Sequence, residues 1–343
     1  MKKKILTILL FLFFTLLAAC SLEPPTPQRP PFRGMALGLF SKEANYDYAK
    51  DIAELKKLGV NSILLNVSWY QANIHSSEIR PRPFNGKDEF TLPDEVLIKV
   101  IHEAHRQGMS VLIFPYLRFD KLMPNEWRGI LKPDHFEIWS QNYEAFLLHY
   151  AKLAQAEGVE LFSVGSELGS LEEKAEFWTP LIQKIRKHYR GKLLYSANWD
   201  HYRYPVFWDQ LDYIALTSYF ELAQNYNPDY QELLQNWQRR KKEILQFQKK
   251  YSQKIIFSEV GYPSLDGSAK YPWNYYASTK PDPEEQALCY RAFIEAWSDT
   301  PQLAAVYWWI WYGEGGLKDL SYTPRGKPAE NLVKAWYLNT QKL

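Results

Sequence analysis

The sequence has only two cysteines, Cys20 and Cys289, among its 343 residues. A fold held together by several disulfides is therefore excluded. Cys20 lies directly after an apolar N-terminal run, and if it carries a lipid, Cys289 has no partner within the chain. Cys289 falls in a segment of helical periodicity, where we expect a buried thiol rather than a reactive one.

Other signatures are also missing. Lysine and arginine total 41 against 39 acidic residues, so no excess of positive charge predicts a nucleic-acid partner. The seven histidines form no metal-ligand pattern, and we expect neither a metal nor an organic cofactor. Ser163, Ser166 and Ser258 lack the Gly-x-Ser-x-Gly context of a serine hydrolase. No Gly-x-Gly-x-x-Gly follows the first apolar strand, which disfavours a dinucleotide-binding sheet.

The N-terminus has the layout of a secretory signal. Three lysines precede an apolar run over residues 5–19, and Leu17-Ala18-Ala19-Cys20 resembles a bacterial lipobox, in which the cysteine is lipidated. We predict a signal peptide over residues 1–19 and a proline-rich tether over 20–32 that begins at the lipidated Cys20. The protein would then be held at the cell envelope, outside the cytoplasm. An uncleaved membrane anchor is the alternative, although the run is shorter than the ~20 apolar residues that a bilayer requires.

The remaining residues, 33–343, alternate between short apolar runs and longer segments of helical period. This pattern is typical of parallel strands joined by crossover helices. Eight runs favour one closed (β/α)8 TIM barrel over an open sheet, and the length suits a single barrel domain. The predicted strands are 34–40, 62–69, 110–117, 160–167, 192–199, 213–219, 254–261 and 304–311.

Helices are predicted over 46–58, 94–107, 136–156, 175–188, 230–250 and 284–297. Gly59, Gly108 and Gly158 each follow a helix and precede a strand, where a glycine with positive φ ends the helix. The fifth crossover, 200–212, shows no clean helical period, and we expect an irregular loop or a short helix there.

Two glutamates are the strongest candidates for chemistry. Glu167 ends the fourth predicted strand, and Glu259 lies near the end of the seventh. Active sites of these barrels lie at the C-terminal ends of the strands, and strands four and seven lie on opposite sides of the ring. Two carboxyl groups facing one another across the barrel mouth are the arrangement that glycosidases use. The alternative is that each glutamate caps a helix or pairs with an arginine of the barrel.

A glutamate on strand four, another on strand seven and a tryptophan after strand eight resemble clan A of the glycoside hydrolases. The motifs at 34–38, 66–71, 164–168 and 258–262 are similar to those of family 113, whose characterised members are β-1,4-mannanases. This resemblance covers essentially the whole chain after the tether. It implies a retaining hydrolase with Glu167 as general acid/base and Glu259 as nucleophile. We therefore expect a raised pKa for Glu167 and a low one for Glu259.

One position departs from the clan. Its members usually place an asparagine before the acid/base, where it contacts the sugar 2-hydroxyl, and this chain has Ser166. The substitution leaves the contact to the axial 2-hydroxyl of mannose open. Asn198, near the end of strand five, is a candidate for the same region, although an asparagine that stabilises a loop is an equal alternative.

Further substrate-binding candidates lie at other strand ends. Tyr219 is placed to donate a hydrogen bond to Glu259, with an ordinary packed tyrosine as the alternative. Alternation along the last strand puts Trp309 and Trp311 on one side and Trp308 on the other, and Trp311 is preferred as the ring beneath the sugar. Trp69, after strand two, is expected to line a neighbouring subsite.

The expected function is hydrolysis of β-linked glycans, most specifically β-1,4-mannan or manno-oligosaccharides, by double displacement. The expected partners are a poly- or oligosaccharide substrate and, through the N-terminal lipid, a membrane; the protein is expected to be a monomer. Two alternatives stay open from the sequence. One is a glycan-binding surface lipoprotein that has lost catalysis, and the other is a clan A glycosidase with a different sugar specificity.

Overall fold

The computed structural model describes residues 29–43, 46–86 and 89–339. The predicted signal peptide, the lipidation site Cys20 and most of the tether lie outside these residues, so those assignments stay predictions. Within the described ranges, no helix combines the length and hydropathy that a membrane crossing demands.

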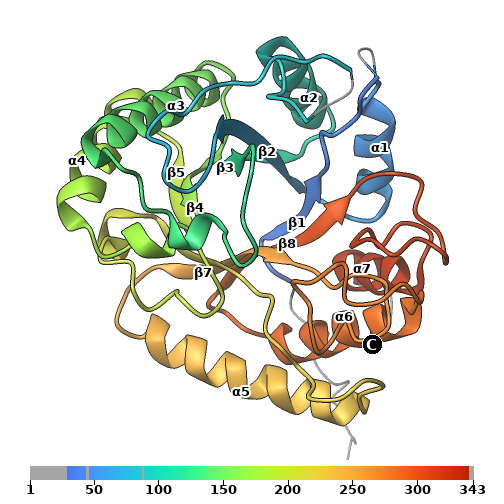
Figure 1. The fold of residues 1–343 in the computed structure, drawn as a ribbon. Helices are drawn as coiled ribbons and strands as arrows, with labels where there is room; N and C mark the ends of the chain where they lie inside the picture. Colours follow the sequence, from blue (N-terminus) through green and yellow to red (C-terminus); the bar gives the residue numbers. More distant parts are fainter. Residues whose placement is uncertain (1–28, 44–45, 87–88, 340–343) are drawn as a thin grey trace, which may run out of the picture.

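Eight parallel strands close into a barrel, as the sequence predicted (Figure 1). Each strand pairs with the next in the chain, and β8 pairs with β1, so the sheet has no free edge. Every observed boundary lies within three residues of the predicted one. The strands are β1 (Phe32–Leu37), β2 (Ser62–Gln71), β3 (Ser110–Phe119), β4 (Leu161–Ser166), β5 (Lys192–Ala197), β6 (Tyr213–Thr217), β7 (Lys254–Val260) and β8 (Leu303–Trp311).

Helices surround the barrel and lead back from the end of one strand to the start of the next (Figure 1). Gly59, Gly108 and Gly158 have φ of 85°, 71° and 68°, which confirms their predicted role at helix ends. The crossover from β5 to β6 holds only the 3-10 turn η3 (Trp208–Gln210), so the irregular connection predicted there is confirmed. The helices are α1 (Ala49–Lys57), α2 (Asp94–Arg106), α3 (Phe136–Ala156), α4 (Ala175–His188), α5 (Tyr230–Gln248), α6 (Pro283–Trp297) and α7 (Pro328–Leu338).

The core has two layers. Branched aliphatic side chains fill the barrel interior, among them Leu64, Leu112, Leu161, Leu194 and Ile256. A second layer lies between the strands and the helices, where α3 to α7 each contribute one buried tryptophan. These tryptophans are Trp139, Trp178, Trp237, Trp297 and Trp336. Much of the aromatic content of the sequence therefore stabilises the scaffold, because large rings bury much apolar area.

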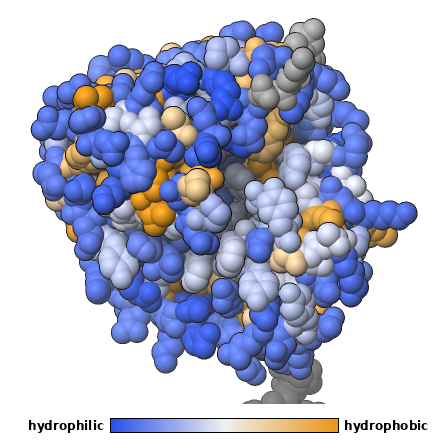
Figure 2. Space-filling view, in the orientation of Figure 1, coloured by the Kyte–Doolittle hydropathy of each residue, from blue (hydrophilic) through white to orange (hydrophobic). Residues whose placement is uncertain are grey.

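Long connections follow the C-terminal ends of β2, β7 and β8 and build the rim of the barrel mouth. Their described residues are 72–86, 89–93, 261–282 and 312–327. The face of the molecule seen in Figure 2 is hollowed near its centre, above the barrel. The chemistry of the molecule is therefore to be sought in this hollow and on its rim.

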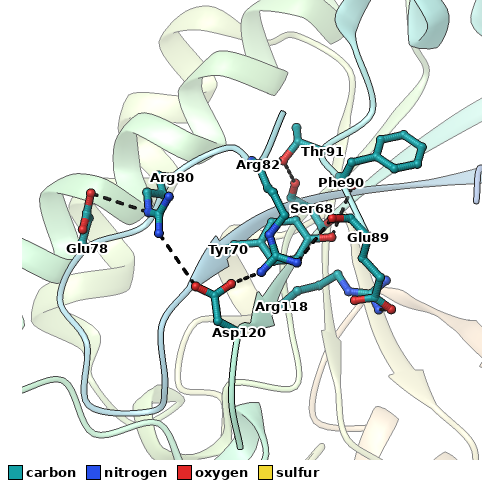
Figure 3. Close-up of polar contacts among 10 residues, drawn as sticks. All are labelled: Ser68, Tyr70, Glu78, Arg80, Arg82, Glu89, Phe90, Thr91, Arg118 and Asp120. Atoms are coloured by element: carbon teal, nitrogen blue, oxygen red, sulfur yellow. Dashed lines mark hydrogen bonds and ion pairs between the residues drawn. The ribbon is translucent and has the colours of Figure 1, made fainter. Parts of the chain in front are cut away.

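The connection from β2 to α2 is braced against the end of β3 by charged side chains (Figure 3). Arg82 forms an ion pair with Asp120, and its guanidinium carbon lies 3.8 Å from the ring centroid of Tyr70. Arg118 of β3 forms an ion pair with Glu89 of the same connection. These contacts fix one wall of the barrel mouth.

Candidate active site

The two predicted catalytic glutamates lie at the C-terminal end of the barrel and are almost fully buried. Glu167 is the residue after β4 and is 6% exposed, and Glu259 is the penultimate residue of β7 and is 5% exposed. The backbone of Glu167 has φ of +55°, a conformation that costs a non-glycine residue of order 1 kcal/mol. Its N–H donates to the carbonyl of Ser196 on β5 at 2.8 Å, which holds the side chain over the barrel.

Two donors hold the Glu167 carboxylate. Arg128 contacts Oε2, with its Nε at 3.1 Å and a terminal nitrogen at 3.0 Å. Thr217 Oγ1 lies 3.0 Å from Oε1. The expected alternative of an arginine partner is therefore present at Glu167, although Arg128 comes from the 3-10 turn η1 (Arg128–Ile130) after β3 and not from a barrel strand.

Glu259 accepts a hydrogen bond from the hydroxyl of Tyr219 at 2.7 Å on Oε2. The hydrogen bond expected between these two residues is thus present. Burial and the negative charge of Glu167 raise the pKa of Glu259 to about 8, against the lowering effects of the Tyr219 hydrogen bond and the Arg128 charge. The low pKa that we expected for Glu259 is wrong for the protein without substrate, because the carboxyl group is buried and, to a lesser extent, because a second carboxylate lies nearby.

The two carboxyl groups lie close enough to influence one another and to share one arginine. The negative charge of Glu167 raises the pKa of Glu259. Burial lowers the pKa of Arg128, but the charges of both glutamates outweigh this effect and raise it. The topology that places β4 and β7 across the ring thus brings together two acidic groups that are 92 residues apart in the sequence.

A cavity of ≈ 600 Å³ opens over the ends of β1, β2, β3 and β8. Tyr322 of its lining lies 6.0 Å from the ring of Tyr219, and Tyr116 lies 5.6 Å from the guanidinium carbon of Arg128. The lining therefore contacts Tyr219 and Arg128, which hold the two glutamates, although neither glutamate lines the cavity itself. Its aromatic lining consists of Phe40, Tyr70, Phe90, Tyr116, Tyr275, Trp309, Tyr312 and Tyr322, and its polar lining includes Lys42, Asn66, Ser68, Glu89, Arg118 and Ser321.

The tryptophans of β8 do not follow the expected alternation. Trp308 lies on the opposite side of the strand from Trp309, as predicted, and its ring stacks on Tyr290 of α6 at 4.1 Å. Trp309 lines the cavity, whereas Trp311 is 2% exposed and packs in the outer core layer. Met35 of β1 pairs with Trp308, and Leu37 pairs with Trp311. An advance of two residues along β1 therefore corresponds to an advance of three residues along β8. This bulge reverses the faces beyond Trp309, and the structure therefore does not bring Trp311 to the cavity.

Trp69 is also turned away from the cavity. Its ring packs against Phe146 of α3 at 5.3 Å, on the helical side of β2. Residues on the opposite face of this strand, including Ser68 and Tyr70, line the cavity instead. Successive side chains of a strand point to opposite faces, so a prediction displaced by one residue selects the wrong side.

Asn198 lies beside the glutamates without lining the cavity. Its Oδ1 is 3.3 Å from Thr217 Oγ1, the hydroxyl that also contacts Glu167, and its amide donates to Asp200 at 2.7 Å. Both expected roles thus fit its position. Ser166 is 2% exposed, and its Oγ has no hydrogen-bond partner among the described residues.

The sequence did not single out Arg128, Asn66 or Thr217 as site residues. Arg128 lies in a short turn with no periodic pattern, and only its position just after a strand connects it with the barrel mouth. Asn66 stands on the cavity side of β2, and its Oδ1 is buried without a partner among the described residues. A buried polar group without a partner is costly, and its place in the cavity lining makes Asn66 a candidate ligand contact.

A cluster of Asp266, Asp282 and Glu285 has carboxylate atoms within 4.8 Å of one another. The Glu285 carboxylate accepts hydrogen bonds from two backbone N–H groups of the β7–α6 connection, and Asp282 caps α6. Asp266 lies 3.6 Å from the ammonium of Lys280. These contacts explain the cluster as an anchor for the connection.

The sequence model of Glycoside Hydrolase Family 113 matches residues 35–323. Among curated proteins, none matches the chain.

Solved structures resemble this chain over most of its length. A GH113 β-mannanase from Alicyclobacillus acidocaldarius, in complex with ManMIm, has 25% identity and a TM-score of 0.79, covering 90% of this chain and 98% of that chain. A second structure, a complex of a GH113 β-1,4-mannanase, has 25% identity and a TM-score of 0.78, covering 90% and 99%. A β-glucuronidase from Faecalibacterium prausnitzii, at 13% identity and a TM-score of 0.60, shares the fold over 92% of this chain and 50% of its own.

Proposed function

The chain belongs to glycoside hydrolase family 113, and we propose that it cleaves β-1,4-linked mannan or manno-oligosaccharides with retention of configuration. It is a glycoside hydrolase of the endo-β-1,4-mannanase type, and its substrate is an oligo- or polysaccharide. The observation that carries the proposal is that Glu167 and Glu259, at the ends of β4 and β7, lie close enough for the charge of one to raise the pKa of the other. The residues that hold them, Arg128 and Tyr219, contact the aromatic lining of a cavity. The β-mannanases that the structure resembles support the choice of sugar.

The proposed reaction has two steps. Glu259 attacks the anomeric carbon while Glu167 gives its proton to the glycosidic oxygen, so that the leaving chain departs as an alcohol and a glycosyl ester forms on Glu259. Water then attacks the same carbon, Glu167 takes its proton, and the ester bond to Glu259 breaks. Two inversions give net retention, and both carboxyl groups return to their starting states.

The protein holds a proton for this reaction. Two carboxyl groups in one buried site do not both ionise readily, and the raised pKa of Glu259 keeps one proton in the pair near neutral pH. Catalysis requires that proton on Glu167 and a negative charge on Glu259. The hydroxyl of Tyr219 stabilises the ionised Glu259, and the substrate oxygen beside Glu167 is the acceptor that draws the proton to that side.

The cavity offers contacts that suit a sugar ring. Trp309 presents a flat apolar face for pyranose C–H groups, and the carbonyl oxygen of the Asn66 side chain is free to accept from a sugar hydroxyl. The hydroxyl of Ser166, one residue before the acid/base, stands where the clan usually has an asparagine. We propose that it makes the contact to the axial 2-hydroxyl of mannose.

A substrate panel tests the proposal. Purified protein is incubated with mannan, glucomannan, xylan and cellulose, and reducing ends are counted; release is expected from mannan and glucomannan. The first product from manno-oligosaccharides is followed by proton NMR, where the β-anomer must appear before mutarotation. Cleavage of xylan or cellulose alone would support a different sugar specificity, an α-anomer would reject double displacement, and binding without release would favour a non-catalytic glycan-binding protein.

A further inference from the structure

The connection between β7 and α6 carries an exposed aromatic surface. Trp273, Tyr275 and Tyr276 are 48%, 52% and 80% exposed, although aromatic rings are usually buried. The stretch 271–277 reads Tyr-Pro-Trp-Asn-Tyr-Tyr-Ala and contains no charged residue. Apolar surface that gathers on one segment, rather than as scattered single side chains, marks an interaction site.

This surface continues the lining of the cavity. Tyr275 belongs to both, and its ring lies 6.3 Å from that of Tyr322 in the cavity wall. The hydroxyl of Tyr322 donates to the carbonyl of Pro272 at 2.7 Å, which ties the segment to the wall. In Figure 2, side chains of intermediate hydropathy border the hollow on the side where Figure 1 draws the β7–α6 and β8–α7 connections.

The segment is held in place before any ligand arrives. Glu285 of α6 accepts from the N–H groups of Gly267 and Ala269, each at 2.8 Å, and fixes the start of the connection. The rings support one another, because Tyr271 and Trp273 lie 6.1 Å apart and Tyr275 and Tyr276 lie 4.2 Å apart. Rigid aromatic side chains lose little conformational entropy on binding, so the exposed rings are prepared for a ligand.

We propose that Trp273, Tyr275 and Tyr276 form a platform that binds the part of a neutral β-linked hexose polymer extending beyond the cavity. The inference rests on the proposed function and deepens it, because it makes a long polysaccharide the preferred substrate over short oligosaccharides. The uncharged segment favours a neutral ligand, and the shared residue Tyr275 makes the platform and the cavity one continuous surface. Tyrosine and tryptophan suit this ligand because each offers an apolar face and a polar edge.

Kinetics on two substrate lengths test the platform. The full chain is compared with the double variant Trp273→Ala/Tyr276→Ala on soluble galactomannan and on 4-nitrophenyl β-mannobioside. We expect KM for the polymer to rise roughly tenfold in the double variant with kcat nearly unchanged, as lost stacking by two rings implies. Both constants for the short glycoside should stay within about twofold of the wild type, since the cavity is intact. Affinity electrophoresis in galactomannan gels should show the same loss of retardation.

Two further variants control the result. Tyr276→Phe keeps the ring and should bind the polymer as the wild type does. Tyr251→Ala removes an aromatic side chain just before β7, at the opposite end of the barrel, and should also leave polymer binding unchanged.

Each outcome decides one claim. An unchanged KM and unchanged gel retardation for the double variant, with wild-type cleavage intact, overturn the platform and leave the proposed function standing. If the wild type self-associates, the double variant is monomeric and both bind the polymer equally well, the rings bind a second copy of the chain. That result also overturns the platform. A wild type that cleaves neither substrate overturns the proposed function, and the gels then test the platform alone.

Discussion

The guanidinium of Arg128 lies 3.0 Å from Oε2 of Glu167, and its charge also acts on Glu259. One cation therefore serves both proposed catalytic groups. It offsets part of the repulsion between the two carboxylates, and without it the site would hold its proton more tightly.

Arg128→Met should lower kcat roughly tenfold to a hundredfold, because the acid/base loses the contact that orients it. The Arg128 charge lowers the pKa of Glu259, so its removal raises that pKa further. The acid limb of the kcat/KM profile, where Glu259 must ionise, should consequently move to higher pH. Arg128→Lys keeps the charge, so the acid limb of its kcat/KM profile should lie at the wild-type pH. Its kcat should recover only in part. A pH profile that is identical in all three proteins contradicts the electrostatic role.

Separate variants distinguish the acid/base from the nucleophile. Glu167→Ala and Glu259→Ala should each lose at least ~10³-fold in activity on mannan, with unchanged far-ultraviolet circular dichroism. A dinitrophenyl leaving group needs no proton, so only Glu167→Ala should still form the glycosyl-enzyme from such a mannoside. With azide, Glu167→Ala should yield the β-glycosyl azide and Glu259→Ala the α-anomer. If Glu167→Ala gave the α-glycosyl azide and Glu259→Ala the β-anomer, Glu259 would be the acid/base and Glu167 the nucleophile.

The Glu259→Gln variant should be more stable than the wild type, by an amount that grows as the pH rises. Between the ordinary glutamate value of 4.5 and about 8, the unfolded carboxyl is ionised while the folded one keeps its proton. Unfolding then releases a proton, so the free energy of unfolding of the wild type falls as the pH rises from 4.5 to about 8. Glutamine stays neutral, and the Tm advantage of the variant should grow from near zero at pH 4.5 to about 3 °C or more at pH 8.5.

The control for this measurement is Glu78→Gln. Glu78 has a side chain that is 73% exposed, and its substitution should leave Tm unchanged across the same range. A constant difference between Glu259→Gln and the wild type at every pH would mean that Glu259 is not buried beside another charge.

The barrel was predictable because its signals are local. Each strand is a short apolar run, and glycines such as Gly59 stand where the backbone needs positive φ. The glutamate pair was predictable because a barrel places its strand ends on one face, so Glu167 and Glu259 follow from their positions in β4 and β7 alone.

The remaining site residues depend on geometry that no local pattern encodes. A bulge in β8 turns Trp311 into the core and leaves Trp309 in the cavity lining. Trp69 points to the opposite face of β2 from its neighbours Ser68 and Tyr70, which line the cavity. Arg128 reaches Glu167 from a turn after a different strand, across 39 residues of sequence. The raised pKa of Glu259 likewise depends on burial and on a neighbour that only the tertiary structure supplies.

The predicted lipid anchor is tested in the cell. Cys20→Ser should move the protein from the membrane fraction to the soluble fraction and abolish labelling by an alkyne analogue of palmitate, because the lipobox cysteine is the acceptor. Activity per mole of protein should not change, since the barrel begins well after this residue. A Cys20→Ser protein that stays with the membranes indicates an uncleaved apolar anchor instead.

Tyr195 of β5 links the backbone after Glu167 to a second buried carboxyl. Its hydroxyl accepts from the N–H of Leu168 at 2.8 Å and donates to Glu172 Oε1 at 2.8 Å. Glu172 is fully buried, and burial raises its pKa to about 8. Tyr195→Phe leaves both groups without this partner, at a cost of about 1–3 kcal/mol for each buried polar group left unpaired.

Because Leu168 directly follows Glu167, Tyr195→Phe should disturb the left-handed backbone that aims the acid/base. We expect a Tm lower by several degrees, together with a roughly tenfold fall in kcat on mannan and a KM within about twofold of the wild type. Tyr290→Phe is the matched control, since the Tyr290 hydroxyl is buried and finds no partner among the described residues. A lower Tm with unchanged kcat would make Tyr195 a purely structural residue, and the position of Glu167 would then depend on Arg128, Thr217 and Ser196.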